Sequence, residues 1–164
     1  MNTSWVWCMV LAAVLLSPAC RQPDGPVPTP SEEDSREIVD VSKDLLAVAG
    51  GDAQAIEDLS YDIGHLGHTE AGVPLAPELG KRLARAISGR KLTDEQARAL
   101  AHQMYLTFGA TELSGRQVDK IEDDVRMQLT QLGVPEDAID PIVRQIDAVQ
   151  DAVSTVQKRW WQVR

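Results

Sequence analysis

Apolar residues recur at intervals of three and four along most of this 164-residue chain, from Ile38 to Trp160. No run of alternating β-branched residues interrupts the pattern. Spacing of three and four places apolar side chains on one face of an α-helix, whereas a half-buried strand alternates every second residue. The sequence therefore predicts an all-α domain, a small bundle of five or six short amphipathic helices.

Glycine and proline residues mark where these helices should begin and end. Glycines close four of the apolar stripes, at Gly50, Gly89, Gly109 and Gly133, which is typical of helix C-termini. Asp140 and Pro141 are expected to be the cap and first residue of the last helix. Because the connections are short, we expect neighbouring helices to be antiparallel and to share one core.

The first twenty residues, MNTSWVWCMVLAAVLLSPAC, have a different character. The uncharged apolar run from Trp5 to Leu16 has about 12 residues, which suits a secretory signal and falls short of the ~20 that span a bilayer. The small residues Ser17 and Ala19 suit a signal-peptidase site. We interpret residues 1–19 as a signal peptide. Simple secretion with cleavage near Ala19 and an uncleaved anchor remain alternatives.

The end of this stretch, Leu16-Ser-Pro-Ala-Cys20, resembles the lipobox of bacterial lipoproteins. The resemblance implies that the Cys20 thiol is diacylated, with palmitate-type chains, and that Cys20 becomes the mature N-terminus. Arg21, where an inner-membrane lipoprotein would have Asp, implies the outer membrane. Several acyl chains would make the attachment stable, since a single chain holds a protein only marginally.

A proline-rich segment follows Cys20. Residues 21–30 read RQPDGPVPTP and lead into the polar SEEDS, which offers too little apolar surface to fold. We predict a disordered, lipid-anchored tether over residues 20–35 and a helical domain over residues 36–164. Some fifteen extended residues would reach roughly 45 Å.

Charge and cysteine content exclude several functions. Asp and Glu number 25 against 16 Lys and Arg, a net charge of −9. Such a balance opposes nucleic-acid binding, which needs clustered cations. Both cysteines, Cys8 and Cys20, lie within the first twenty residues, so the predicted domain has neither a disulfide nor a cysteine nucleophile. Phosphate loops, GxSxG and HExxH patterns are absent from the sequence, and we expect no enzyme activity and no cofactor.

Two similar motifs, Leu92-Thr93-x-x-Gln96 and Leu113-Ser114-x-x-Gln117, precede apolar stripes. Thr or Ser followed three residues later by Gln predicts a capping box, and each leucine predicts a hydrophobic staple. The motifs also resemble the LTxxQ motifs of periplasmic stress chaperones and metal-resistance sensors. That resemblance implies an alternative function as a periplasmic metal-binding sensor or chaperone.

Four residues in and beside a glycine-containing loop offer metal-ligand chemistry. His65 and His68 stand three residues apart, with Asp62 before them and Glu70 after them. Imidazole nitrogen and carboxylate oxygen are usual ligands of zinc or nickel. These residues are our candidate divalent-metal site, and a solvated loop without metal is the other interpretation.

The C-terminal segment joins cations to aromatic residues, in Lys158, Arg159, Trp160 and Trp161. Such a segment is suited to contact with a partner or a membrane surface. In the other interpretation, Trp160 continues the core stripe and closes one end of the bundle.

Together these features predict a cell-envelope lipoprotein at the periplasmic face of a membrane. Its helical domain is expected to be a non-catalytic module that binds an envelope protein. A soluble periplasmic protein is the alternative.

Overall fold

The structure is a computed structural model that describes residues 29–66, 72–109 and 113–162, with side chains described as far as Val153. It consists of helices, and the described residues contain no strand, which confirms the all-α class. The elements in chain order are α1 (Glu32–Ala49), α2 (Ala55–His65), the short 3₁₀ helix η1 (Val73–Leu75), α3 (Ala76–Ile87), α4 (Asp94–Gly109), α5 (Gly115–Gln131) and α6 (Glu136–Gln162).

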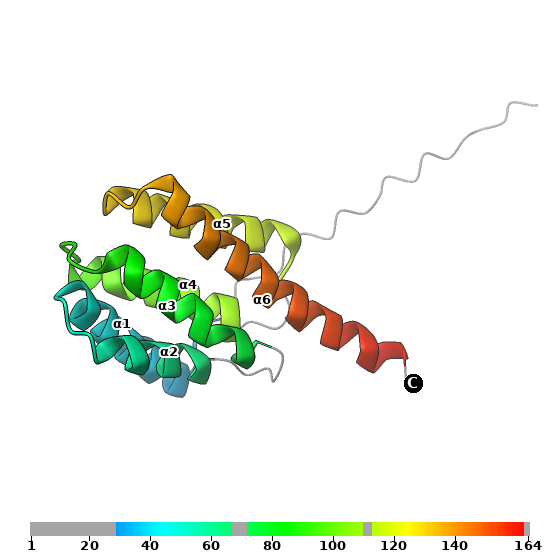
Figure 1. Cartoon of the computed structure of the whole chain (residues 1–164). Coiled ribbons are helices and arrows are strands. Elements are labelled where there is room, and N and C mark those ends of the chain that lie inside the picture. The colour runs from blue at the N-terminus through cyan, green and yellow to red at the C-terminus, as the bar shows by residue number, and fades with distance from the viewer. Residues whose placement is uncertain (1–28, 67–71, 110–112, 163–164) are drawn as a thin grey trace, which may run out of the picture.

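Successive helices run up and down, so the bundle has two ends (Figure 1). At one end, the Gly89 amide donates to the Ala49 carbonyl at 3.1 Å, and Arg90 Nη1 donates to the Leu132 carbonyl at 3.0 Å. This far end therefore joins the ends of α1, α3 and α5. At the opposite end, which we call the entry end because α1 begins there, the Tyr105 hydroxyl donates to Asp34 Oδ2 at 3.4 Å. The ends of α2 and α4 lie at this entry end.

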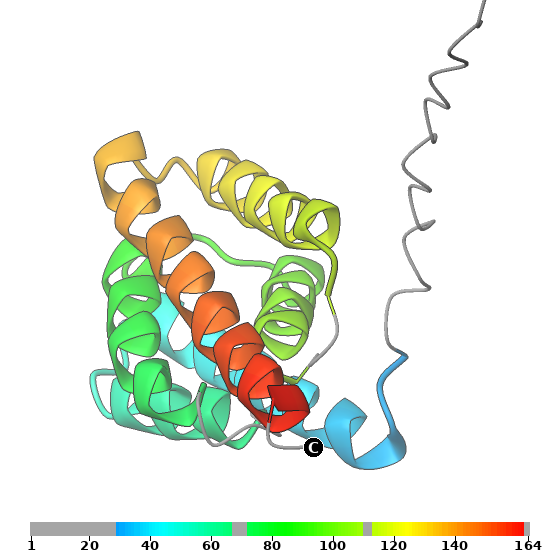
Figure 2. The ribbon, with the colours of Figure 1, turned by 90° about the vertical axis from the view of Figure 1, so that its right-hand side faces the viewer.

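Helix α6 runs from the far end to the entry end. Gln150 Nε2 donates to the carbonyl oxygen of Thr107, near the end of α4. Figure 1 shows the last turns of α6 extending past the neighbouring helices, and Figure 2 places them on the same side of the bundle as the first turn of α1. The start and the end of the described chain thus lie at one end of the bundle.

One apolar core fills the bundle, and the predicted stripes supply most of it. Their buried members include Leu45, Leu59, Leu83, Phe108 and Ile146. Helix α4 departs from the expected single stripe, because Gln103, Tyr105 and Thr107 are buried along with its apolar face. The sequence indicates this burial on more than one face, since residues 99–108 contain no Asp, Glu, Lys or Arg.

Two helices begin before their expected starts. Helix α1 begins at Glu32, inside the stretch assigned to the tether, because Ser31 and Asp34 form a capping box: the Ser31 amide donates to Asp34 Oδ2 at 2.8 Å, and the Asp34 amide donates to Ser31 Oγ at 3.1 Å.

The prediction that Asp140 and Pro141 start the last helix is wrong, since α6 begins at Glu136 and contains Pro141. The Pro135 carbonyl accepts the amides of Ala138 and Ile139, at 3.0 and 3.2 Å, and the acidic first turn suits a helix N-terminus. Pro141 is the sixth residue of α6, and its missing N–H removes one bond of the helical ladder.

Helices α2 and α3 approach closely at Gly80. A Cβ at position 80 would lie 2.7 Å from Ser60 Oγ and 2.8 Å from Ser60 Cα. Glycine is therefore required for this contact. The Ser60 hydroxyl donates to the Ile56 carbonyl at 2.9 Å, so it brings no unpaired polar group to the contact.

Candidate functional site

The predicted site residues fall partly outside the described part of the chain. Cys20, His68 and Glu70 lie outside the described residues, and the side chains of Lys158, Arg159, Trp160 and Trp161 do too. The backbone of these last four residues belongs to α6. Asp62 and His65 are described, both in the last turns of α2.

Asp62 and His65 have different surroundings. Asp62 forms a carboxyl pair with Asp44 of α1, whereas His65 is exposed and lies beside Tyr61, with 4.2 Å between ring centroids. Among the residues the structure describes, no three His, Cys, Asp or Glu side chains are grouped to hold a metal ion. The four-residue metal site remains a prediction, because two of its members are outside this part of the chain.

The two LTxxQ-like motifs form capping boxes, as predicted. The Thr93 amide donates to Gln96 Oε1 at 3.0 Å and the Gln96 amide to Thr93 Oγ1 at 3.2 Å. The Ser114 amide donates to Gln117 Oε1 at 2.8 Å and the Gln117 amide to Ser114 Oγ at 3.3 Å. These side chains thus satisfy backbone amides at the starts of α4 and α5, and the structure gives them a local role.

The Asp44–Asp62 pair connects α1 to α2. Burial, and then the charge of Asp62 and a hydrogen bond with it, raise the pKa of Asp44 from 3.8 to about 7. Two carboxyl groups can bond to each other only when one of them carries a proton, and their like charges oppose loss of that proton. The pair therefore keeps a proton at mildly acidic pH and loses it around pH 7.

A second carboxyl pair connects α5 to α6. Burial, and then a hydrogen bond with Asp147 and its charge, raise the pKa of Glu122 to about 7, while Arg126 acts in the opposite direction. Glu122 is half-buried, and its interaction with Asp147 places it against α6. Arg126 is held by Asp140, at 3.0 Å, and by Glu136.

A cavity of about 280 Å³ lies between α4 and α5. Its lining residues are His102, Gln103, Leu106, Leu113, Gln117, Lys120, Ile121 and Asp124. Gln103 is only 8% exposed, and its Nε2 donates to Asp124 Oδ2 at 3.3 Å, while its Oε1 accepts no hydrogen bond from the described residues. The cavity has the size and the free acceptor for a small apolar group with one hydrogen-bond donor.

Charge is unevenly distributed over the bundle. Between Glu32 and Leu66, the α1–α2 hairpin carries ten acidic and two basic residues. Between Ala76 and Lys91, α3 and the turn after it carry five basic residues and one acidic residue, Glu78. A domain with net charge −9 thus has one region of opposite sign.

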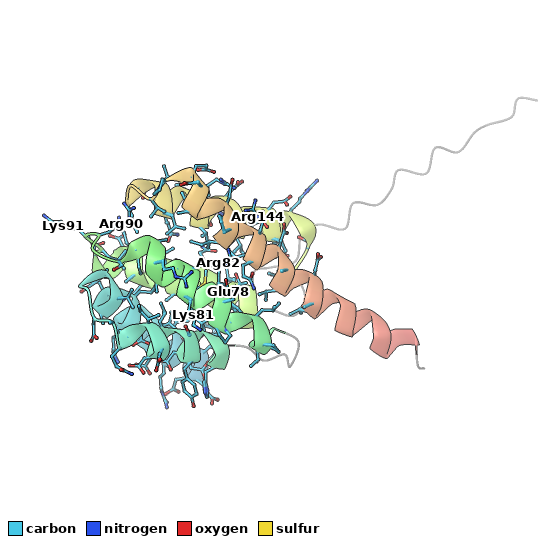
Figure 3. The ribbon with its side chains drawn as sticks, in the orientation of Figure 1. Glu78, Lys81, Arg82, Arg90, Lys91 and Arg144 are labelled. Carbon is cyan, nitrogen blue, oxygen red and sulfur yellow. The ribbon has the colours of Figure 1, made fainter. Side chains whose placement is uncertain are left out.

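We define the basic face as Lys81, Arg82, Arg85 and Lys91. Figure 3 shows Lys81 and Arg82 along α3, with Arg90 and Lys91 beyond its end and Arg144 on the adjacent α6. Lys81, Arg85 and Lys91 are exposed. Arg82 Nε lies 2.8 Å from Glu78 Oε1. Arg90 is excluded from the basic face because its guanidinium donates to the carbonyls of Ala86, Leu132 and Gly133.

The apolar spacing of α3 explains how its cations come to share a face. Its buried residues include Leu79, Leu83 and Ile87, so positions 78, 81, 82 and 85 fall on the opposite side of the helix. Sequence reasoning missed the basic face because it weighed the total charge. The clustering of five cations within residues 81–91 is the sequence feature that could have revealed the basic face.

No protein-family model, curated protein or solved structure matches this chain. None of the helices in the described residues combines the length and the apolar character needed to cross a bilayer.

Proposed function

We propose that this chain is a lipoprotein of the bacterial cell envelope, facing the periplasm at the outer membrane, and that its helical domain is a non-catalytic binding module. Cys20 would carry the lipid, and the proline-rich residues after it would form the tether. The domain would then be confined to the neighbourhood of a membrane, where even a weak contact acts at high effective concentration.

The arrangement of the two ends of the described chain carries this proposal. Helix α1 begins at the entry end, directly after the proposed tether, and α6 ends on the same side of the bundle (Figures 1 and 2). A tether joined there would keep the cations and tryptophans of residues 158–161 close to the anchored side. Aromatic and basic residues favour both membrane interfaces and protein contacts.

The surroundings of the perturbed carboxyl groups favour binding over catalysis. Asp44 and Glu122 have the raised pKa values that a general acid needs, yet each is engaged with a carboxyl of a neighbouring helix. Neither residue lines the cavity between α4 and α5. Each carboxyl pair thus links two neighbouring helices. The exposed charges of the bundle remain available for contact with a partner.

The test is the mass and detergent partitioning of the chain recovered from bacterial membranes. We expect the wild-type protein to carry the added mass of a lipid and to enter the detergent phase. Cys20→Ala should abolish both properties, whereas Cys8→Ala, which removes the thiol within the signal segment, should preserve them. An unmodified wild-type protein in the aqueous phase would refute the lipoprotein proposal.

A further inference from the structure

We propose that the basic face docks the helical domain onto a membrane surface rich in anionic phospholipids. The docking rests on the proposed function in one respect, because the tether supplies the closeness to a membrane that a weak contact needs. The ligand chemistry is the phosphate-bearing headgroup, recognised by Lys and Arg side chains on α3.

The cations of the basic face are available for such contact. Lys81 and Arg85 are one helical turn apart and exposed, and Lys91 is exposed beyond the end of α3. Within the described residues, none of these three makes an ion pair with a carboxylate. Their charge is therefore directed to solvent, and headgroup phosphates can pair with it without displacing an internal partner.

Apolar residues border the basic face where α3 begins. Val73 of η1 is 41% exposed, and Pro77 is exposed one turn before Lys81. These side chains are small enough to enter the boundary between headgroups and acyl chains while the cations reach the phosphates. The surface therefore has the pairing of apolar and basic residues that suits the plane of a membrane.

The acidic hairpin fixes the orientation. Helices α1 and α2 carry a net charge of opposite sign to the basic face, so an anionic surface repels them while it attracts α3. A tethered domain would consequently lie with α3 toward the lipid. Because α1 begins at Glu32, the tether from Cys20 to Ser31 would reach roughly 35 Å when extended, which leaves freedom for this sideways position.

Two considerations favour lipid over an acidic protein. Headgroups require no shape complementarity, and the exposed Tyr61, which lines a hollow with Val73 and Pro77, is of the residue type enriched at membrane interfaces. Each Lys or Arg near an anionic membrane strengthens binding about fivefold. The three cations left unpaired within the described residues, Lys81, Arg85 and Lys91, give a contact that is weak in free solution and that the tether converts into reversible docking.

The experiment measures flotation of the chain from Cys20 onward with vesicles, in reduced form and without added lipid. This form omits the apolar run, which would itself enter lipid. Vesicles of phosphatidylcholine are compared with vesicles in which roughly one third of the lipid is phosphatidylglycerol. We expect binding only to the anionic vesicles. Added salt should reverse this binding, because salt screens the attraction between exposed charges.

Matched charge reversals locate the contact. Lys81→Glu with Arg85→Glu should weaken binding to anionic vesicles about 25-fold or more. Arg36→Glu with Arg98→Glu changes the net charge equally at exposed positions on α1 and α4, and it should leave binding within about threefold of wild type. Circular dichroism confirms that both variants are folded before binding is compared.

Three outcomes would overturn the docking proposal: equal binding to both vesicle types, equal loss in the two double variants, or no binding to anionic vesicles. If the chain ignored vesicles but bound polyglutamate through Lys81 and Arg85, the basic face would be assigned to an acidic protein instead. Because the vesicle measurement does not use lipidation in cells, its failure is distinguishable from failure of the Cys20 test.

Discussion

A proton shared between Asp44 and Asp62 makes the stability of this domain depend on pH. The folded-state pKa of Asp44 is raised to about 7 from 3.8, so between these values the folded chain holds a proton that the unfolded chain has released. Stability from this group therefore falls as pH rises from about 4 to 7 and then levels off. Glu122 acts in the same direction between α5 and α6.

We expect Asp44→Asn to remove much of this dependence, because an amide can donate to Asp62 at every pH. At pH 8 the variant should be more stable than wild type by about 1 kcal/mol, or roughly 3–5 °C in melting temperature. At pH 4, near the pKa of Asp44 in the unfolded chain, the difference should nearly vanish. Thermal unfolding followed by circular dichroism at the two pH values measures both quantities.

Asp123→Asn supplies the control for that comparison. Asp123 is exposed on α5, and its substitution changes the net charge by the same amount without touching either carboxyl pair. A pH-independent gain from Asp44→Asn, or an equal pH dependence in the control, would contradict the shared proton.

These carboxyl pairs were beyond the reach of sequence reasoning. Asp44 and Asp62 are on different helices, and their contact depends on how α1 and α2 rotate against each other. The sequence grouped Asp62 with His65 because the two are one turn apart, yet the structure directs Asp62 to α1. Capping boxes were predictable for the opposite reason, since Thr93 and Gln96 interact within one turn.

At the level of helices and their connections, Arg90 joins two elements at the far end. Its Nε donates to the Ala86 carbonyl of α3 at 2.7 Å, and its Nη1 donates to the carbonyls of Leu132 and Gly133 after α5, at 3.0 and 2.5 Å. Backbone carbonyls at helix C-termini lack helical partners, so one guanidinium satisfies several of them.

We predict that Arg90→Ala destabilises the domain by roughly 1.5–3 kcal/mol, the range for hydrogen bonds that involve a charged group. Arg90→Lys should recover only part of this, since an ammonium cannot reproduce the planar fork. Lys91→Ala should change stability by less than about 0.5 kcal/mol, because Lys91 is exposed. Urea unfolding compares the three variants, and equal losses at positions 90 and 91 would argue against the bridging role.

Helix boundaries could be predicted where local chemistry decides them. Gly115 follows the Ser114 cap at the start of α5, and Ala76 and Pro77 start α3, as the residues indicate. Tertiary packing decides the rest. Helix α4 buries polar residues because α1, α5 and α6 surround it, and α6 continues through Pro141 although proline is a common first residue of a helix.

For the whole molecule, the sequence predicted one helical core and antiparallel neighbours, but it did not give the spatial order that brings the start of α1 and the end of α6 together. That order bears on the two interpretations of the C-terminal segment. Figure 1 shows the last turns of α6 running past the neighbouring helices. We therefore favour contact with a partner or membrane for residues 158–164.

Ending the chain at Gln157 tests this preference. Because the core of the described residues already includes α6 as far as Val153, we expect the shortened chain to unfold in a single cooperative transition, within about 2 °C of wild type. Its membrane or partner contact should weaken, since the removed residues include Trp160, Trp161 and three cations. A fall of more than about 5 °C would instead assign Trp160 to the core, because removal of a buried tryptophan costs about 3–5 kcal/mol. Melting temperature and vesicle flotation of the same two proteins thus separate a core residue from a contact residue.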